Sequence, residues 1–282
     1  MYPDLPKSYK GVYPFRLGTT SFIYPDNYIP NVKMLGPYID EIELLFLESG
    51  AKESLPSKHE IDELSRLSRE FEITYNVHLP VDIFMGDNNF LTRNYAVETV
   101  KKVMDLCEPL APSTYTLHLS IDEKTAKTGC LDEWQKLLYK GMEKLISAGI
   151  KSEAVSIENL NYSIDWVDRI IDDFNLSVCI DIGHLILYGF DLETVFNKYL
   201  DKTTIIHLHG VENGRDHISL DRISEDFIPP LMEILKRFTG VVSLEVFSYN
   251  HLDLSLKFLE KCWQREMGKM GSLPIHKGYE LP

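Results

Sequence analysis

The sequence has no long hydrophobic run and no excess of basic residues. Nowhere do 18 apolar residues follow one another, and the N-terminal stretch MYPDLPKSYKGVYPF has no apolar segment like that of a signal peptide. We therefore expect a cytoplasmic protein that does not associate with membranes. The formal net charge is −14, from 29 basic and 43 acidic residues. Because a duplex-DNA binder normally presents a basic face to phosphates, this balance argues against a nucleic-acid partner and favours a small substrate or metal cations.

Cysteine is also scarce. The four cysteines, Cys107, Cys130, Cys179 and Cys262, are scattered without a CxxC pair or a spacing typical of metal ligands. Neither a disulfide framework nor a thiolate zinc site is indicated, so we expect reduced and buried thiols. Low-complexity blocks and short repeats are absent too, and 44% hydrophobic residues with 26% charged residues are typical of an ordinary globular protein.

The chain does contain a regular alternation of short apolar or β-branched runs with longer stretches of helical spacing, repeated eight times. The runs are FRLGTTS (15–21), IELLFL (42–47), ITYNVHL (73–79), TYTLHLS (114–120), AVSIENL (154–160), SVCIDIG (177–183), TTIIHLH (203–209) and VVSLEVF (241–247). Between them, a helix predicted over 131–146 ends near Gly149, and Asp191 is a good N-cap for another helix.

Parallel strands joined by helices must be covered on both faces, and eight such units close into a barrel. The sequence therefore predicts an α/β protein with a single (β/α)₈ TIM-barrel domain over residues 15–267. Residues 1–14 form an N-terminal extension and residues 268–282 a C-terminal tail in this prediction. An open doubly wound sheet is the alternative, but no GxGxxG motif follows the first run.

Catalytic residues of a TIM barrel lie at the C-terminal ends of its strands. Here the third to eighth runs all end in imidazole or carboxylate side chains: His78, His118, Glu158, Asp181 with His184, His207 with His209, and Glu245. Each one alone has an ordinary explanation as a hydrogen-bonded rim residue or a helix cap. Together they would crowd one pocket with repelling, desolvated charges, and divalent cations remove that cost.

Mixed histidine and carboxylate ligands without thiolates suit divalent transition metals, with Zn²⁺ or Mn²⁺ expected first, rather than Ca²⁺. So many ligands predict two ions, with a third left open. A pair of ions about 3.5 to 4 Å apart stabilises the entering and leaving oxygens of a phosphoryl transfer, which points to hydrolysis of a phosphoester.

The stretch HLHGVENGRDHISL (207–220) holds three of the nine histidines. His207 ends the seventh run, while Asp216 and His217 return to the pocket from the loop beyond it. Because adjacent extended residues point to opposite sides, we expect only one of the two to reach the ions, and we choose His217. For His209, two roles stay open: ligation of a metal ion, or a contact that supports a ligand or the substrate. Asn159, beside Glu158, is a second candidate for such a contact.

Several of these motifs together resemble a known family: VHLP, LHLS, IENL, CIDIGHL followed by GFD, IHLHG and LEVFS. The pattern is similar to that of the xylose-isomerase-like TIM barrels, which include sugar isomerases, sugar epimerases and apurinic endonucleases of the endonuclease IV type. Over residues 15–262 the chain most resembles the cobamide-remodelling phosphodiesterases, through FRLGTTSFIYPD, IELLFLES, HLPVD and IENLNY in particular. The activity of that family is hydrolysis of the phosphoribosyl bond in the cobamide nucleotide loop.

The resemblance implies roles for individual residues. Glu158, Asp181, His207 and Glu245 match the superfamily's core metal site and are the expected catalytic residues. His78 and His118 match two further histidine ligands of the endonuclease, with Glu158 shared between sites, and His184 and His217 match ligands of its third zinc. The endonuclease has Asp-x-His in the last loop and an acidic residue two positions after the strand-seven histidine. This chain has Arg215, Asp216, His217 and His209 there, which leaves the third ion open.

The leading hypothesis is a metal-dependent cobamide phosphodiesterase that yields cobinamide phosphate and an α-riboside. In it, the GTTS turn, Thr19, Thr20 and Ser21, would contact the phosphate or a corrin amide, or else only satisfy its own backbone. A sugar isomerase or epimerase, with Glu158 and Glu245 as acid and base around one ion, is the alternative. The net charge of −14 argues against an apurinic endonuclease. A non-enzymatic alternative is a corrinoid-binding or metal-storage protein, which would bind its ligand without turnover. The accepted lower base and the oligomeric state stay open.

Overall fold

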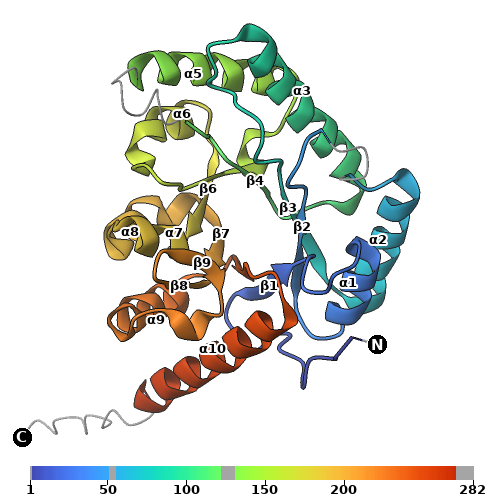
Figure 1. The fold of residues 1–282 in the computed structure, drawn as a ribbon, viewed down its shortest axis with the longest axis vertical. Helices are drawn as coiled ribbons and strands as arrows, with labels where there is room; N and C mark the ends of the chain where they lie inside the picture. The colour runs from blue at the N-terminus through green and yellow to red at the C-terminus, as the bar shows by residue number, and fades with distance from the viewer. Residues whose placement is uncertain (1, 51–54, 122–130, 271–282) are drawn as a thin grey trace, which may run out of the picture.

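Eight parallel strands form a closed barrel in the computed structural model, which describes residues 2–50, 55–121 and 131–270 (Figure 1). Their order around the barrel is β1-β10-β7-β6-β5-β4-β3-β2. The strands are β1 (Arg16–Thr20), β2 (Glu41–Leu45), β3 (Thr74–His78), β4 (Tyr115–Leu117), β5 (Val155–Glu158), β6 (Ser177–Asp181), β7 (Thr203–Leu208) and β10 (Val241–Leu244). Each lies within or overlaps one predicted run, and the TIM-barrel prediction is confirmed.

Helices surround the barrel and cover the outer face of its strands (Figure 1). They are α1 (Tyr28–Leu35), α2 (Lys58–Phe71), α3 (Phe90–Cys107), α5 (Leu131–Ser147), α6 (Asp168–Asp173), α7 (Ile182–Tyr188), α8 (Leu192–Tyr199), α9 (Ile228–Arg237) and α10 (Tyr249–Met270). The Asp191 side chain caps α8 by accepting a hydrogen bond from the backbone N–H of Thr194. After α5, Gly149 has a φ of +93°, as expected for a residue that terminates a helix.

Polar side chains line much of the barrel interior, while the apolar core lies between the strands and the helices. On β2, Ile42 and Leu44 belong to that core, whereas Glu41 and Glu43 alternate with them and contact polar side chains of other strands. Glu41 accepts a hydrogen bond from Asn76 Nδ2 at 2.9 Å. The interior can therefore hold charged groups, provided that each has a partner.

A small hairpin interrupts the connection after β7. Its strands are β8 (Gly210–Glu212) and β9 (Arg215–Ile218), which pair antiparallel and lie beside α7. The turn residues Asn213 and Gly214 have φ values of +53° and +74°, the left-handed conformation that a two-residue type I′ turn needs. The hairpin returns His217 toward the end of the barrel.

The predicted extension and tail differ in how they meet the barrel. Leu5 and Tyr9 of the extension are buried in the main apolar core, so the described part of the extension, residues 2–14, packs on the barrel. Helix α10 continues to Met270, so the first three residues of the predicted tail are helical, and the rest of the tail lies outside the described residues. Within the described ranges, no helix combines the length and apolarity needed to cross a bilayer.

Candidate metal centre

Glu158, the last residue of β5, is the centre of the polar cluster at the C-terminal end of the barrel. It is 2% exposed. Its Oε2 atom lies 3.2 Å from His78 Nε2 and 2.8 Å from His118 Nε2, at the ends of β3 and β4. Its Oε1 atom lies 3.3 Å from His184 Nδ1 and 3.6 Å from His207 Nδ1. One carboxylate thus faces imidazoles from both sides, as a ligand shared between two ions must.

The second half of the cluster consists of Glu158, Asp181, His207 and Glu245, whose potential ligand atoms all lie within 4.8 Å of one another. His207 Nδ1 is 3.1 Å from Glu245 Oε2. Both atoms are buried, yet neither makes a hydrogen bond to any described residue. Buried polar atoms are normally satisfied, so this pair of unpartnered lone-pair atoms fits a bound cation. His78, His118 and Glu158 form an adjoining group of the same kind.

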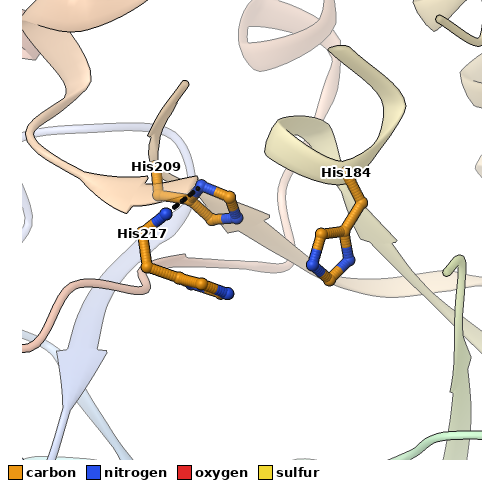
Figure 2. A group of neighbouring side chains, drawn as sticks. All are labelled: His184, His209 and His217. Carbon is orange, nitrogen blue, oxygen red and sulfur yellow. Dashed lines mark hydrogen bonds between the residues drawn. The ribbon is translucent and has the colours of Figure 1, made fainter. Parts of the chain in front are cut away.

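A third group consists of three histidines, His184, His209 and His217, which surround one small space (Figure 2). The backbone N–H of His217 donates to His209 Nδ1 at 3.0 Å, shown as the dashed line in Figure 2. His209 Nε2 lies 3.1 Å from Asp181 Oδ1, so His209 joins the hairpin to the carboxylate at the end of β6. His209 therefore has the contacts of a supporting residue, and it is also within reach of a third ion.

Both Asp216 and His217 lie near His184. Asp216 Oδ2 lies 3.9 Å from His184 Nε2, and the rings of His217 and His184 have centroids 5.7 Å apart. The premise that adjacent residues must point to opposite sides is wrong here, because His217 has a φ of +49° and is not extended. His217, but not Asp216, belongs to a group whose ligand atoms converge.

The remaining candidates make backbone contacts. Asn159 Oδ1 accepts from the backbone N–H of Asp181 at 2.8 Å, and its Nδ2 donates to the Asp181 carbonyl at 3.0 Å, so it fixes the end of β6. Thr19 and Thr20 donate to the carbonyls of Leu244 and Val246. The Ser21 hydroxyl accepts from the backbone N–H of Leu45. All three hydroxyls of the GTTS turn thus contact backbone groups of neighbouring segments rather than of the turn itself.

Two interior residues were missed in the sequence. Glu43 on β2 is fully buried, and its Oε1 atom is 3.0 Å from His207 Nε2. The alternation of EIELL was its signal, since acidic residues are unexpected in a strand buried on both faces. Cys179 forms a potential ligand group with Glu158 and His207, and burial raises the pKa of its thiol. Like Cys179, Cys107 and Cys262 are free and buried, and Cys130 lies outside the described residues.

The charges of the cluster balance one another. Burial opposes the charged form of Glu158, but the imidazoles of His118 and His207 hold its pKa well below the usual range. Burial also lowers the pKa of His78, yet contact with the Glu158 carboxylate outweighs it and raises that pKa to about 9. For His184, Asp181 and Glu158 overcome burial and raise the pKa to about 10. Protons on these imidazoles occupy the place that cations would take, so the residues present fit a divalent metal.

Comparisons with known proteins agree with this architecture. Residues 31–268 match the family described as xylose isomerase-like TIM barrel. An inosose dehydratase of Lacticaseibacillus casei is 30% identical over 105 residues, which make up 31% of this chain and only 34% of that protein.

Solved structures resemble the whole barrel. A D-tagatose 3-epimerase-like protein has a TM-score of 0.74 at 20% identity, over 91% of this chain and 100% of that one. The 3-keto-D-glucoside 4-epimerase of E. coli has a TM-score of 0.67 at 14% identity, over 89% and 99% of the two chains. Endonuclease IV of Thermus thermophilus has a TM-score of 0.66 at 13% identity, over 89% and 99%. At such identities these likenesses establish the fold alone.

Proposed function

The chain belongs to the xylose isomerase-like TIM-barrel family, and on that premise we propose that it is a metal-dependent phosphodiesterase acting on cobamides. The reaction is hydrolysis of the phosphoribosyl bond in the nucleotide loop, which gives cobinamide phosphate and the α-riboside of the lower base. Water adds to phosphorus, the bond from phosphorus to the ribosyl oxygen breaks, and that oxygen leaves with a proton.

The observation that supports this proposal most strongly is the shared position of Glu158. One of its oxygens faces His78 and His118, and the other faces His184 and His207. A single ion held by the group of Glu158, Asp181, His207 and Glu245 would leave His78 and His118 without a role in the chemistry. Two adjoining ligand groups match the needs of phosphoryl transfer, in which the attacking and leaving oxygens both need stabilisation.

The side chains have distinct tasks in this reaction. Divalent ions, when bound, would activate water and neutralise charge on the phosphate oxygens. Asp181 and Glu245 supply negative charge to hold those ions, and Asn159 and His209 keep Asp181 in place. His217 Nδ1 donates to the Glu245 carbonyl at 3.2 Å, which leaves its Nε2 lone pair for a ligand or a substrate proton.

Exposed aromatic rings beside the cluster support a substrate with a flat group. Tyr188 is 46% exposed with its ring 6.1 Å from that of His184, and Phe247 is 42% exposed with its ring 5.2 Å from that of His217. Aromatic side chains stack on planar bases with about 1–3 kcal/mol per base. We therefore expect Phe247→Ala to raise KM for the cobamide on the order of 5- to 150-fold with a smaller change in kcat.

A sugar epimerase is the second candidate. One ion between two carboxylates would need only the group of Glu158, Asp181, His207 and Glu245. Two of the similar structures are described as epimerases or epimerase-like. In that reaction Glu158 and Glu245 would exchange a proton with the carbon next to a carbonyl.

A substrate panel separates these reactions. Purified protein with Mn²⁺ or Zn²⁺ is offered an adenosylated cobamide, a ketohexose and an abasic duplex, with Glu158→Gln as the inactive control. We expect cobinamide phosphate from the cobamide and no change in the other two. Epimerised sugar with intact cobamide would establish the second candidate, and a nicked duplex would establish an endonuclease.

A further inference from the structure

Glu43 is a buried carboxylate with one end fixed. It lies on β2 inside the barrel with no exposed surface. Its Oε2 atom accepts a hydrogen bond from Ser243 Oγ on β10 at 2.6 Å. Its Oε1 atom lies 3.0 Å from His207 Nε2 on β7. The carboxylate therefore connects β10 to the imidazole that faces Glu158 and Glu245.

Burying this charge requires a partner. An unpaired buried carboxylate is strongly destabilising, because it loses its hydration without gaining a compensating charge or hydrogen bond. Among the described residues, no Lys or Arg forms an ion pair with Glu43, and the imidazole of His207 lies at ion-pair distance from it. The two atoms are at ion-pair distance without an aligned hydrogen bond. An N–H on His207 Nε2 is thus the arrangement that best compensates the Glu43 charge.

The position of that proton decides what the other ring nitrogen can do. A neutral imidazole carries one N–H and one lone pair. With the proton on Nε2, the lone pair belongs to Nδ1, which lies 3.1 Å from Glu245 Oε2 and 3.6 Å from Glu158 Oε1. Carboxylates that hold the far nitrogen of a ligating histidine fix its tautomer and its ring orientation.

We infer that Glu43 is a positioning residue of the metal centre, which holds His207 as the Nε2–H tautomer with Nδ1 directed at the cation. The inference rests on the metal centre of the proposed function and not on its substrate. Glu43 acts through His207, so replacing Glu43 weakens binding of the ion without removing any of its ligands.

The same strand offers a matched control. Glu41 lies two residues before Glu43, is equally buried and also faces the interior. Its carboxylate bonds to Thr74, Asn76 and Ser113, and none of these belongs to the metal cluster. A loss of zinc affinity in variants of both residues would reflect stability alone. A loss of zinc affinity found only in the Glu43 variants would reflect the contact of Glu43 with His207.

The test measures zinc affinity by chelator competition, without substrate, for the wild type, Glu43→Leu, Glu43→Gln and Glu41→Gln. We expect Glu43→Leu to bind one ion about 10- to 100-fold more weakly and Glu41→Gln to bind like the wild type. Glu43→Gln keeps an acceptor oxygen and should lose less than Glu43→Leu. Should Glu43→Leu fail to fold, Glu43→Gln compared with Glu41→Gln decides the matter by the same affinity difference.

A second readout follows the ring proton itself. Nitrogen NMR of histidine-labelled, zinc-loaded protein, with the His207 signal assigned by its loss in His207→Gln, should show a protonated Nε2 and a coordinated Nδ1. Unchanged zinc affinity in both Glu43 variants, an equal loss in Glu41→Gln, or a coordinated Nε2 would overturn the inference. A protein that leaves cobamides intact but still loses zinc affinity through Glu43→Leu would refute the proposed function and retain this inference.

Discussion

Replacing Glu158 with glutamine tests the metal centre at its most connected residue. The substitution keeps the shape of the side chain and removes its charge. Four imidazoles lie within 3.6 Å of the carboxylate, and both adjoining ligand groups include it. Glu158→Gln therefore disturbs two ion sites at once, whereas any other single substitution in the cluster leaves one of those two groups complete.

The magnitude follows from that double role. Loss of a supporting partner of a metal ligand costs about 10- to 100-fold in affinity, and loss of the ligand itself costs at least as much. Applied to two ions, this amounts to roughly 10²- to 10⁴-fold, or about 3 to 6 kcal/mol at about 1.4 kcal/mol per factor of ten. The fold should persist, because the glutamine amide still hydrogen-bonds the neighbouring imidazoles. A loss of about 1 to 3 kcal/mol in the metal-free protein corresponds to a melting point lower by several degrees.

The assay combines elemental analysis after dialysis with product formation at saturating metal. Wild type should retain at least two transition-metal ions per chain, and Glu158→Gln fewer, with no measurable turnover. Glu41→Gln serves as the control for replacing a buried glutamate elsewhere in the barrel. Full turnover of Glu158→Gln, or an unchanged ion count, would refute the shared-ligand assignment.

Three further predictions follow from the same cluster. Asp181→Asn should abolish turnover and leave the circular dichroism spectrum unchanged, while His209→Ala should retain part of the turnover. An equal loss of turnover in the two variants would make His209 a ligand. His217→Ala should lower cobamide hydrolysis about 10- to 100-fold, and normal hydrolysis with a normal ion count would restrict the β8–β9 hairpin to closing a surface loop. The metal-free protein should lose stability to urea as pH rises from about 6.5 to about 10. The folded-state pKa values of His78 and His184, raised by Glu158 and Asp181 to about 9 and about 10, exceed the ordinary 6.5. Their contribution is therefore complete below 6.5, decreases above it and is lost as pH rises through about 9 and about 10. Stability that is constant or rising over that range would show that the imidazoles are not paired with those carboxylates.

The sequence predicted the barrel because its periodic pattern was strong. Eight apolar runs, each followed by a helical stretch, leave few topologies open, and each run contributes one barrel strand. The residues at the ends of these strands could be placed near one another for the same reason, since parallel strands of a barrel end on one face. Glu158 and its neighbours follow from topology and do not depend on exact side-chain directions.

Features that depend on local backbone conformation were harder to predict. The Asn213–Gly214 pair is a strong hairpin signal, yet the strands on either side of it are only three and four residues long. His217 adopts a left-handed φ that histidine rarely takes, so its direction could not follow from alternation. Glu43 was missed because its strand looked like a buried apolar run, although the barrel interior is polar enough to hold it.

The most direct test of the account is where the oxygen of water ends up during hydrolysis. The metal-loaded protein is incubated with an adenosylated cobamide in water enriched in the heavy oxygen isotope, and both products are examined by mass spectrometry. Attack at phosphorus predicts heavy oxygen in cobinamide phosphate and none in the α-riboside. Heavy oxygen in the riboside would place the attack at carbon, and an intact cobamide under conditions where two ions are bound would contradict the proposed activity itself.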